Sequence, residues 1–212
     1  MVELSFTTIR MRRATPGAGM RLLRPLALLF VPLTSGLRVL VTGAGGRTGS
    51  LVFDKLNKDY DSVEPLGLVR SKKATKALCK LGATEAQAVR GDTMDLSSIR
   101  SAMAGCDAVV LCTSAVPKIL PWSIVTLLFR KTILRAKEPG RPKFKFGANG
   151  TPQEVDWLGA KNQIDAAKAA GVGHFVFISS MGGTQPENFL NSIGKQADGS
   201  GGDILLWKRK AE

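Results

Sequence analysis

The chain of 212 residues contains only three cysteines, Cys79, Cys106 and Cys112. They are too few and too widely separated for a disulfide framework or a zinc site, which excludes a small domain stabilised by disulfides or by zinc. Cys112 lies in an apolar run, where we expect it to fill a small buried space. The scarcity of cysteine fits a reducing compartment best.

Acidic residues are scarce in two stretches, and the formal net charge is +13. Residues 1–36 contain five arginines and one acid, and residues 118–145 contain eight lysines or arginines and one acid. The rest of the chain is close to balance. The sequence lacks the basic stripe interleaved with aromatic residues that nucleic-acid binding would favour. The charge is typical of solvated surface and a targeting segment, with attraction to anions as an alternative.

The N-terminal segment, residues 1–36, is rich in arginine and hydroxyl side chains, which is typical of an organelle transit peptide. We expect chloroplast targeting. The apolar run Pro25–Leu33 is too short to span a bilayer, but it could be the core of a signal peptide. A disordered extension, a start misassigned upstream of Met20, and a cytoplasmic protein are the other interpretations.

From residue 37 onward, short apolar runs alternate with helical patterns, which predicts an α/β fold of the doubly wound, Rossmann type with a parallel sheet. Asp95 is expected to cap one helix, and Thr151 with Glu154 forms a capping box at the start of another. The predicted strands are 37–43, 63–70, 86–92, 107–115 and 174–180; the predicted helices are 47–59, 71–82, 96–105 and 151–171.

The strongest motif is "VLVTGAGGRTGS", in which Gly43, Gly46 and Gly49 lie between a predicted strand and a predicted helix. Such a loop must turn sharply, let a pyrophosphate approach the backbone, and pack the helix closely on the sheet. The helix N-terminus then offers free N–H groups to the phosphates. We therefore predict a dinucleotide site here, which includes Arg47 and Thr48.

The end of the second predicted strand lacks the acid that NAD sites use to bind the ribose hydroxyls. Basic residues follow instead: Arg70, Lys72 and Lys73, with Arg47 in the glycine loop. They could pair with a 2′-phosphate, so we predict NADP, with NAD as the less favoured cofactor. The lysines could also be an exposed first helical turn. Asp92, after the third strand, suits an adenine contact.

Several stretches together resemble the atypical short-chain dehydrogenase/reductases of the NAD(P)H-binding, NmrA-like kind, and especially a plant and algal group of chloroplast-associated proteins. These stretches are "VLVTGAGGRTGS", "LVRS", "GDTMD", "CDAVVLCTSAVPK", "VDWLGAKNQIDAAKAAGVGHFVFISSMGGTQP" and "ILLWKRKAE". The resemblance covers residues 38–212. It implies one Rossmann domain over residues 37–212, incomplete at its C-terminal side and interrupted by an insert at about 117–150.

The resemblance also implies roles for individual residues. Thr113, Ser114 and Ala115 follow the fourth strand, where relatives line the ribose and nicotinamide. Ser180 falls at the position of the active-site serine. Lys208 falls at the position of the lysine that holds the nicotinamide ribose, although a solvated helix lysine is an alternative interpretation.

The chain has a single tyrosine, Tyr60, and it lies far from these positions in the predicted topology. The family position of the proton-donating tyrosine is Ile204. A reductase would then need another proton source: Ser180, water or the substrate. Asp156 lies near the position of a structural asparagine in extended relatives. The last helix stops early, for which a truncated sequence is the favoured interpretation and a variant with a defective substrate side the alternative.

The insert is unusually apolar around residues 120–129 and basic afterwards. It could be an interfacial helix on anionic lipid, a cover for the substrate cleft, or retained intron sequence. For the whole chain we predict an NADP(H)-dependent oxidoreductase that acts on a small carbonyl or enone. The alternative is a non-catalytic NADP(H)-binding protein that senses redox state or assists assembly in the plastid, with a protein partner.

Overall fold

A computed structural model describes residues 6–10, 36–135, 140–196, 199 and 201–212. The chain divides into two compact units. The first, here called the sheet unit, comprises residues 8–112 and 163–177. The second, called the hairpin unit, comprises residues 113–162 and 178–212 together with the N-terminal residues up to 7.

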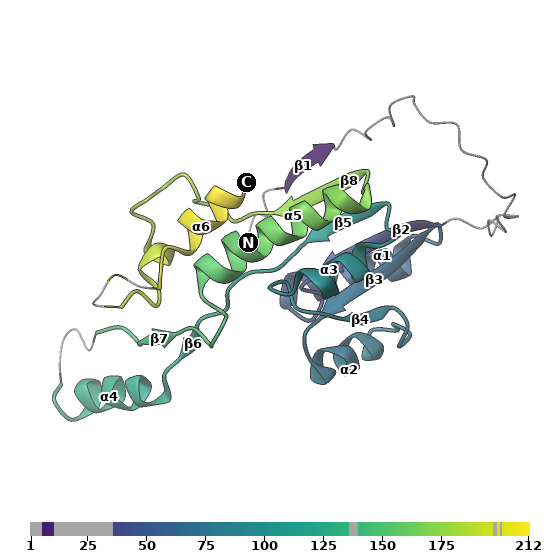
Figure 1. Cartoon of the computed structure of the whole chain (residues 1–212). Coiled ribbons are helices and arrows are strands. Elements are labelled where there is room, and N and C mark those ends of the chain that lie inside the picture. Colours follow the sequence, from purple (N-terminus) through teal and green to yellow (C-terminus); the bar gives the residue numbers. More distant parts are fainter. Residues whose placement is uncertain (1–5, 11–35, 136–139, 197–198, 200) are drawn as a thin grey trace, which may run out of the picture. The chain divides into compact units, whose positions relative to one another are not determined.

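The sheet has the strand order β1-β8-β5-β2-β3-β4, in which β1 is Phe6–Arg10 (Figure 1). The pairs β2–β3, β3–β4, β2–β5 and β5–β8 are all parallel. Their bounds are β2 Leu37–Thr42, β3 Val63–Val69, β4 Ala88–Arg90, β5 Ala108–Leu111 and β8 His174–Ile178. From β4 across to β8 this is the doubly wound order of a Rossmann fold, so the predicted α/β class is confirmed.

Helices connect the parallel strands of the sheet unit, as the apolar periodicity predicts. They are α1 Arg47–Asp59, α2 Lys72–Lys80 and α3 Leu96–Met103. Phe53 of α1 and Leu78 of α2 are fully buried in one cluster with Val41 and Val69 of the strands. Asp95 caps α3 by accepting a hydrogen bond from the Ser97 amide, as predicted. Because the strands are parallel, α1, α2 and α3 each begin at the edge of the sheet where the preceding strand ends, and their buried faces hold them against the sheet.

Three predictions about local structure need correction. The strand expected at 107–115 ends at Leu111, because the backbone after it leaves the sheet. The helix expected at 151–171 has its capping box at Thr151 and Glu154 but begins as a π-helix, η1, over Gln153–Leu158, and continues as α5 over Gly159–Ala170. Cys112 is half-buried beside the core rather than enclosed in it.

The hairpin unit contains the predicted insert and the C-terminal helix. Its elements are β6 Lys118–Ile119, α4 Pro121–Thr132, β7 Phe144–Lys145, the 3₁₀ helix η2 Phe189–Ser192 and α6 Ile204–Ala211 (Figure 1). β6 and β7 pair antiparallel, and α4 lies in the connection between them. Ala115, Phe146 and Val155 form a small buried cluster against which Ile204 packs.

The N-terminal segment holds one described element, the strand β1 at Phe6–Arg10. The expected signal or transit features at 11–35 lie outside the described residues. Within the described part of the chain, no helix is both long enough and apolar enough to cross a membrane.

Candidate dinucleotide site and lysine centre

The glycine loop between β2 and α1 has the backbone geometry that a phosphate loop requires. Gly43 has a φ of 67°, a conformation that a side chain would strain. The Gly46 amide donates to the Gly43 carbonyl at 2.9 Å, which closes the turn. Gly46 is the N-cap of α1, and no described side chain caps this helix end; its first turn also contains no acid. The first N–H groups of α1 are therefore available to an anion.

Gly49 sets the distance between α1 and the loop. A Cβ on this residue would lie 2.2 Å from the Gly43 carbonyl oxygen and 2.9 Å from the Ala44 Cα. Neither backbone atom can move away cheaply, so only glycine fits. The three glycines of the predicted motif therefore have a structural reason, and the loop fits a dinucleotide pyrophosphate.

Two further glycines support the loop and were missed by the motif. A Cβ on Gly45 would lie 2.7 Å from the Ala74 Cβ, and one on Gly67 would lie 2.6 Å from a Leu78 methyl group. Gly67 stands in the apolar strand β3, and an isolated glycine in a strand often marks close approach of another element. That signal in the sequence could have identified it.

The four cations expected near the adenosine ribose are all exposed. Arg47 follows the glycine loop, Arg70 follows β3, and Lys72 and Lys73 open α2. None of them pairs with an acid elsewhere in the described ranges. The first turn of α2 is free of acids, and its N-cap, Ser71, accepts a hydrogen bond from the Ala74 amide. The end of β3 therefore presents positive charge to a ligand.

Asp92 is half-buried and has a local structural role. Its carboxylate accepts a hydrogen bond from the Met94 amide at 3.0 Å, and its backbone amide donates a hydrogen bond to the Ser98 hydroxyl at 3.1 Å. These bonds hold the turn before α3. A contact with adenine stays a prediction.

A buried ion pair lies at the centre of the hairpin unit. Lys208 of α6 is 4% exposed and Asp156 of η1 is 2% exposed. Their Nζ and Oδ1 atoms are 3.2 Å apart. Lys208 also donates to the Thr113 carbonyl at 3.4 Å, and the Ala115 amide donates to Asp156 Oδ2 at 3.1 Å. The alternative interpretation of Lys208 as a solvated helix lysine is therefore wrong.

Asp156 is the residue that sequence reasoning undervalued. The resemblance places it near a structural asparagine, whereas the structure makes it the counter-ion of Lys208. A signal was present, because Asp156 and Gln163 occupy positions of an otherwise apolar helical stripe that includes Ala160 and Ala167. Acids on such a stripe are rarely buried unless they are paired. The π-helical turn is a further sign, since such turns often occur at functional sites.

The three residues after β5 that the resemblance singles out, Thr113, Ser114 and Ala115, differ in burial and in contacts. The Thr113 carbonyl and the Ala115 amide are both engaged with the Lys208–Asp156 pair. Thr113 is half-buried, Ala115 is buried, and Ser114 between them is exposed. The structure therefore brings Thr113, Ala115 and Lys208 together, whereas the contacts of Thr113, Ser114 and Ala115 with the ribose and nicotinamide stay predictions.

Ser180 follows β8 and is half-buried. Its hydroxyl makes no hydrogen bond with another described residue. The neighbouring Ser179 is buried, and its hydroxyl donates to the Glu212 carboxylate. Of the two serines, Ser180 is the one whose hydroxyl is available to a ligand.

An aliphatic side chain, Ile204, occupies the position that the resemblance assigns to the proton-donating tyrosine. Ile204 packs against Ala115, Phe146 and Val155. Tyr60 belongs to the sheet unit, where it ends α1 and is exposed. The described part of the hairpin unit therefore contains no tyrosine that could donate a proton beside Lys208.

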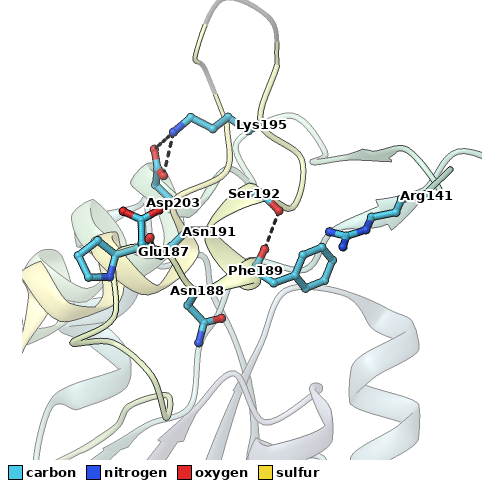
Figure 2. Close-up of a pocket in the computed structure, with 9 residues that line it drawn as sticks. Arg141, Glu187, Asn188, Phe189, Asn191, Ser192, Lys195 and Asp203 are labelled. Carbon is cyan, nitrogen blue, oxygen red and sulfur yellow. Dashed lines mark hydrogen bonds and ion pairs between the residues drawn. The ribbon is translucent and has the colours of Figure 1, made fainter.

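A pocket of about 390 Å³ lies in the hairpin unit. Figure 2 shows the Arg141 guanidinium over the Phe189 ring, 4.6 Å from its centroid. On another side of the pocket, Lys195 Nζ bonds both carboxylate oxygens of Asp203 at 3.1 and 3.2 Å. The remaining lining residues are Pro186, Glu187, Asn188, Asn191 and Ser192. The sequence contained no recognisable signal for this pocket.

Comparison with known proteins agrees with this geometry. Residues 43–212 match the model of the family described as NAD(P)H-binding. The chain is 44% identical over 179 residues to an uncharacterized chloroplastic protein of Arabidopsis thaliana, covering 84% of this chain and 49% of that protein. It is 41% identical over 182 residues to sanguinarine reductase of Eschscholzia californica, covering 83% and 63%. The chain thus spans about half to three fifths of the length of these two relatives.

Two more distant matches complete the comparison. Protein TIC 62 of Arabidopsis thaliana, a chloroplastic protein, is 26% identical over 202 residues, which cover 94% of this chain and 23% of that protein. A solved structure from Bacillus halodurans, classed with the NAD-dependent epimerases/dehydratases, superposes with a TM-score of 0.52 at 24% identity. It covers 83% of this chain and 63% of that one, and it supports the Rossmann-type fold.

Proposed function

Because the chain belongs to the NAD(P)H-binding family, we propose that it is an NADP(H)-dependent oxidoreductase that transfers hydride to or from a small carbonyl or enone. The observation that carries this proposal is the buried Lys208–Asp156 pair, which includes the lysine that the resemblance assigns to the nicotinamide ribose. Burial of two charges costs desolvation free energy, so a pair kept at such a position supports a functional role. The relative named as a reductase supports the same reaction class.

NADP(H) fits the residues of the sheet unit. The glycine loop and the open N-terminus of α1 suit the pyrophosphate, and Gly49 lets α1 pack closely on the loop because a Cβ there would meet the Gly43 carbonyl oxygen. The exposed Arg47 and Arg70 have no acidic partner in the described ranges, so both remain available for a 2′-phosphate. The absence of an acid at the end of β3 favours NADP over NAD.

The chemistry expected of the hairpin unit is proton handling. Bound NADPH supplies a hydride when it is present. Asp156 keeps the Lys208 ammonium in place through the contact between Nζ and Oδ1. The Ser180 hydroxyl is uncommitted among the described residues and is the proposed proton donor, in direct contact with the substrate or through water. Ile204 offers no proton at the usual tyrosine position.

Oxidation of NADPH across a panel of carbonyls, enones and quinones tests the proposal with the whole chain. We expect Ser180→Ala and Lys208→Met each to lower kcat/KM by about 100-fold, the scale of acid–base catalysis. Ser101→Ala and Lys210→Met are matched controls, since both residues are exposed. Turnover that is indifferent to Ser180→Ala and Lys208→Met would contradict the assigned roles.

A second candidate function is favoured by Ile204. Its packing in an apolar cluster leaves the site without the family proton donor, which suits an NADP(H)-binding protein that senses redox state or assists assembly. This candidate predicts NADPH-dependent capture of a protein partner without turnover. Equal capture with and without NADPH would argue against it.

We also propose that the protein resides in the chloroplast. The basic N-terminal segment motivates this, and two of the relatives are named as chloroplastic. Import of the whole chain into isolated chloroplasts, with protection from added protease, is the expected result. A purely cytoplasmic distribution of a C-terminal fluorescent fusion would refute it.

A further inference from the structure

Helix α4 of the insert exposes its apolar side chains instead of burying them. None of its twelve residues is buried. Trp122 is 80% exposed, and the surface continues through the exposed residues Ile124, Val125, Leu128, Phe129, Ile133 and Leu134. Soluble monomers rarely leave so many neighbouring apolar side chains in water, and larger patches of this kind mark an interaction site.

Three polar side chains of α4 lie on one side of the helix. Ser123, Thr126 and Arg130 are spaced i, i+3 and i+7, so they share one side of the helix. The Ser123 hydroxyl bonds the Leu120 carbonyl at 2.6 Å and, just before β7, the Lys143 carbonyl at 3.5 Å. The polar strip therefore begins against the protein's own backbone.

Positive charge surrounds this apolar surface. In residues 113–135 and 140–150 there are seven lysines or arginines and no acid. These cations are exposed, and none forms an ion pair within the described part of the chain: Lys118, Arg130, Lys131, Arg135, Arg141, Lys143 and Lys145. A partner for this surface must be apolar and negatively charged.

We propose that α4 and its basic flanks dock the protein on the surface of an anionic lipid bilayer. The exposed apolar side chains of α4 are flanked by seven exposed cations and by no acid in residues 113–135 and 140–150, and this combination suits anionic headgroups above an apolar lipid layer. Trp122 and Phe129 suit the boundary between headgroups and acyl chains. A helix of this length extends about 18 Å, too short to span a bilayer, so it lies in the interface.

Sedimentation of the whole chain with lipid vesicles tests the docking. We expect binding to vesicles that contain phosphatidylglycerol, weaker binding to pure phosphatidylcholine, and release by salt because screening removes the electrostatic attraction. The double variant Val125→Glu/Leu128→Glu should lower the partition coefficient by about tenfold or more, since carboxylates are repelled by anionic lipid. Both residues are more than half exposed, so the fold tolerates the change.

Leu51→Glu is the matched control, because Leu51 is 67% exposed on α1 and lies outside the insert. It should bind vesicles as the unchanged protein does. A second double variant, Arg130→Gln/Lys131→Gln, should keep weak binding but lose much of its salt dependence. Equal vesicle binding by all variants would overturn the proposal. So would a native dimer that Val125→Glu/Leu128→Glu converts to a monomer, without any vesicle binding by the native protein, since a second copy would then cover α4.

Discussion

The Lys208–Asp156 pair provides the most demanding test of the hairpin unit. Lys208→Met removes the ammonium but keeps most of the side-chain volume, and it leaves the Asp156 carboxylate buried with one remaining hydrogen bond, from the Ala115 amide. Removal of one partner from a buried pair costs about 3–5 kcal/mol in free energy of unfolding. For a chain of this size, the midpoint of thermal unfolding should fall by about 10 °C.

The exposed pair Lys195–Asp203 supplies a matched control. Its Nζ and Oδ1 atoms are 3.1 Å apart, nearly the separation in the buried pair, but the Lys195 side chain is 46% exposed. Lys195→Met should therefore cost less than about 1 kcal/mol. The double variant Lys208→Met/Asp156→Asn removes both charges. Its loss of unfolding free energy should be smaller than the sum of the losses in Lys208→Met and Asp156→Asn.

Thermal and urea unfolding, followed by circular dichroism, measure these differences. The coupling free energy from the double-mutant cycle should be about 2 kcal/mol, within the range for residues in contact. If Lys208→Met is as mild as Lys195→Met, the pair is solvated and the structural account of Lys208 is wrong. Strictly additive variants would refute the direct contact.

Three further perturbations test other parts of the molecule. Gly49→Ala should abolish NADPH binding and cost about 1–3 kcal/mol of stability, because its Cβ would meet the Gly43 carbonyl; Gly147→Ala, whose Cβ meets nothing within 4 Å, should change neither fluorescence titration nor melting. Hydrogen bonds from the start of α3 lower the pKa of Asp95 below its usual 3.8, so its stabilisation is present above that value and lost as pH falls through the lowered folded pKa. Asp95→Ala should therefore have a lower melting temperature than the unchanged protein at neutral pH, and this difference should narrow below pH 3.8. Asp95→Asn should keep most of the stabilisation by the cap. A difference between Asp95→Ala and the unchanged protein that widens in acid would contradict this. Burial raises the pKa of the Cys106 thiol, so mass spectrometry should find it alkylated by iodoacetamide more slowly than the half-buried Cys79, and faster labelling of Cys106 would contradict its burial.

The sheet unit could be predicted from the sequence because its signals are local. A strand, a glycine loop and a helix adjoin in the chain, so Gly43, Gly46 and Gly49 identify their own geometry without knowledge of distant contacts. The caps at Ser71 and Asp95 are local for the same reason. Strand ends and the burial of Cys112 are less predictable, since both depend on neighbouring elements.

The hairpin unit could not be predicted to the same extent because its contacts join distant segments. Asp156 and Lys208 stand on different helices, and neither helical pattern alone indicates that the two charges meet. Nor does helical periodicity report the π-helical turn over Gln153–Leu158 that contains Asp156. The insert is apolar in sequence, but only the structure reveals that α4 buries none of its residues.

The most direct test of the central claim is a fluorescence titration of the protein with NADPH and NADH, beside Arg70→Glu and the control Arg100→Glu. Arg70 is exposed at the end of β3, and Arg100 is exposed on α3. We predict tighter binding of NADPH than of NADH, and a loss of NADPH affinity of about tenfold or more in Arg70→Glu alone, because a carboxylate there repels the 2′-phosphate. Equal affinity for the two nucleotides, untouched by Arg70→Glu, would contradict the NADP assignment; binding of neither by a folded protein would contradict the function.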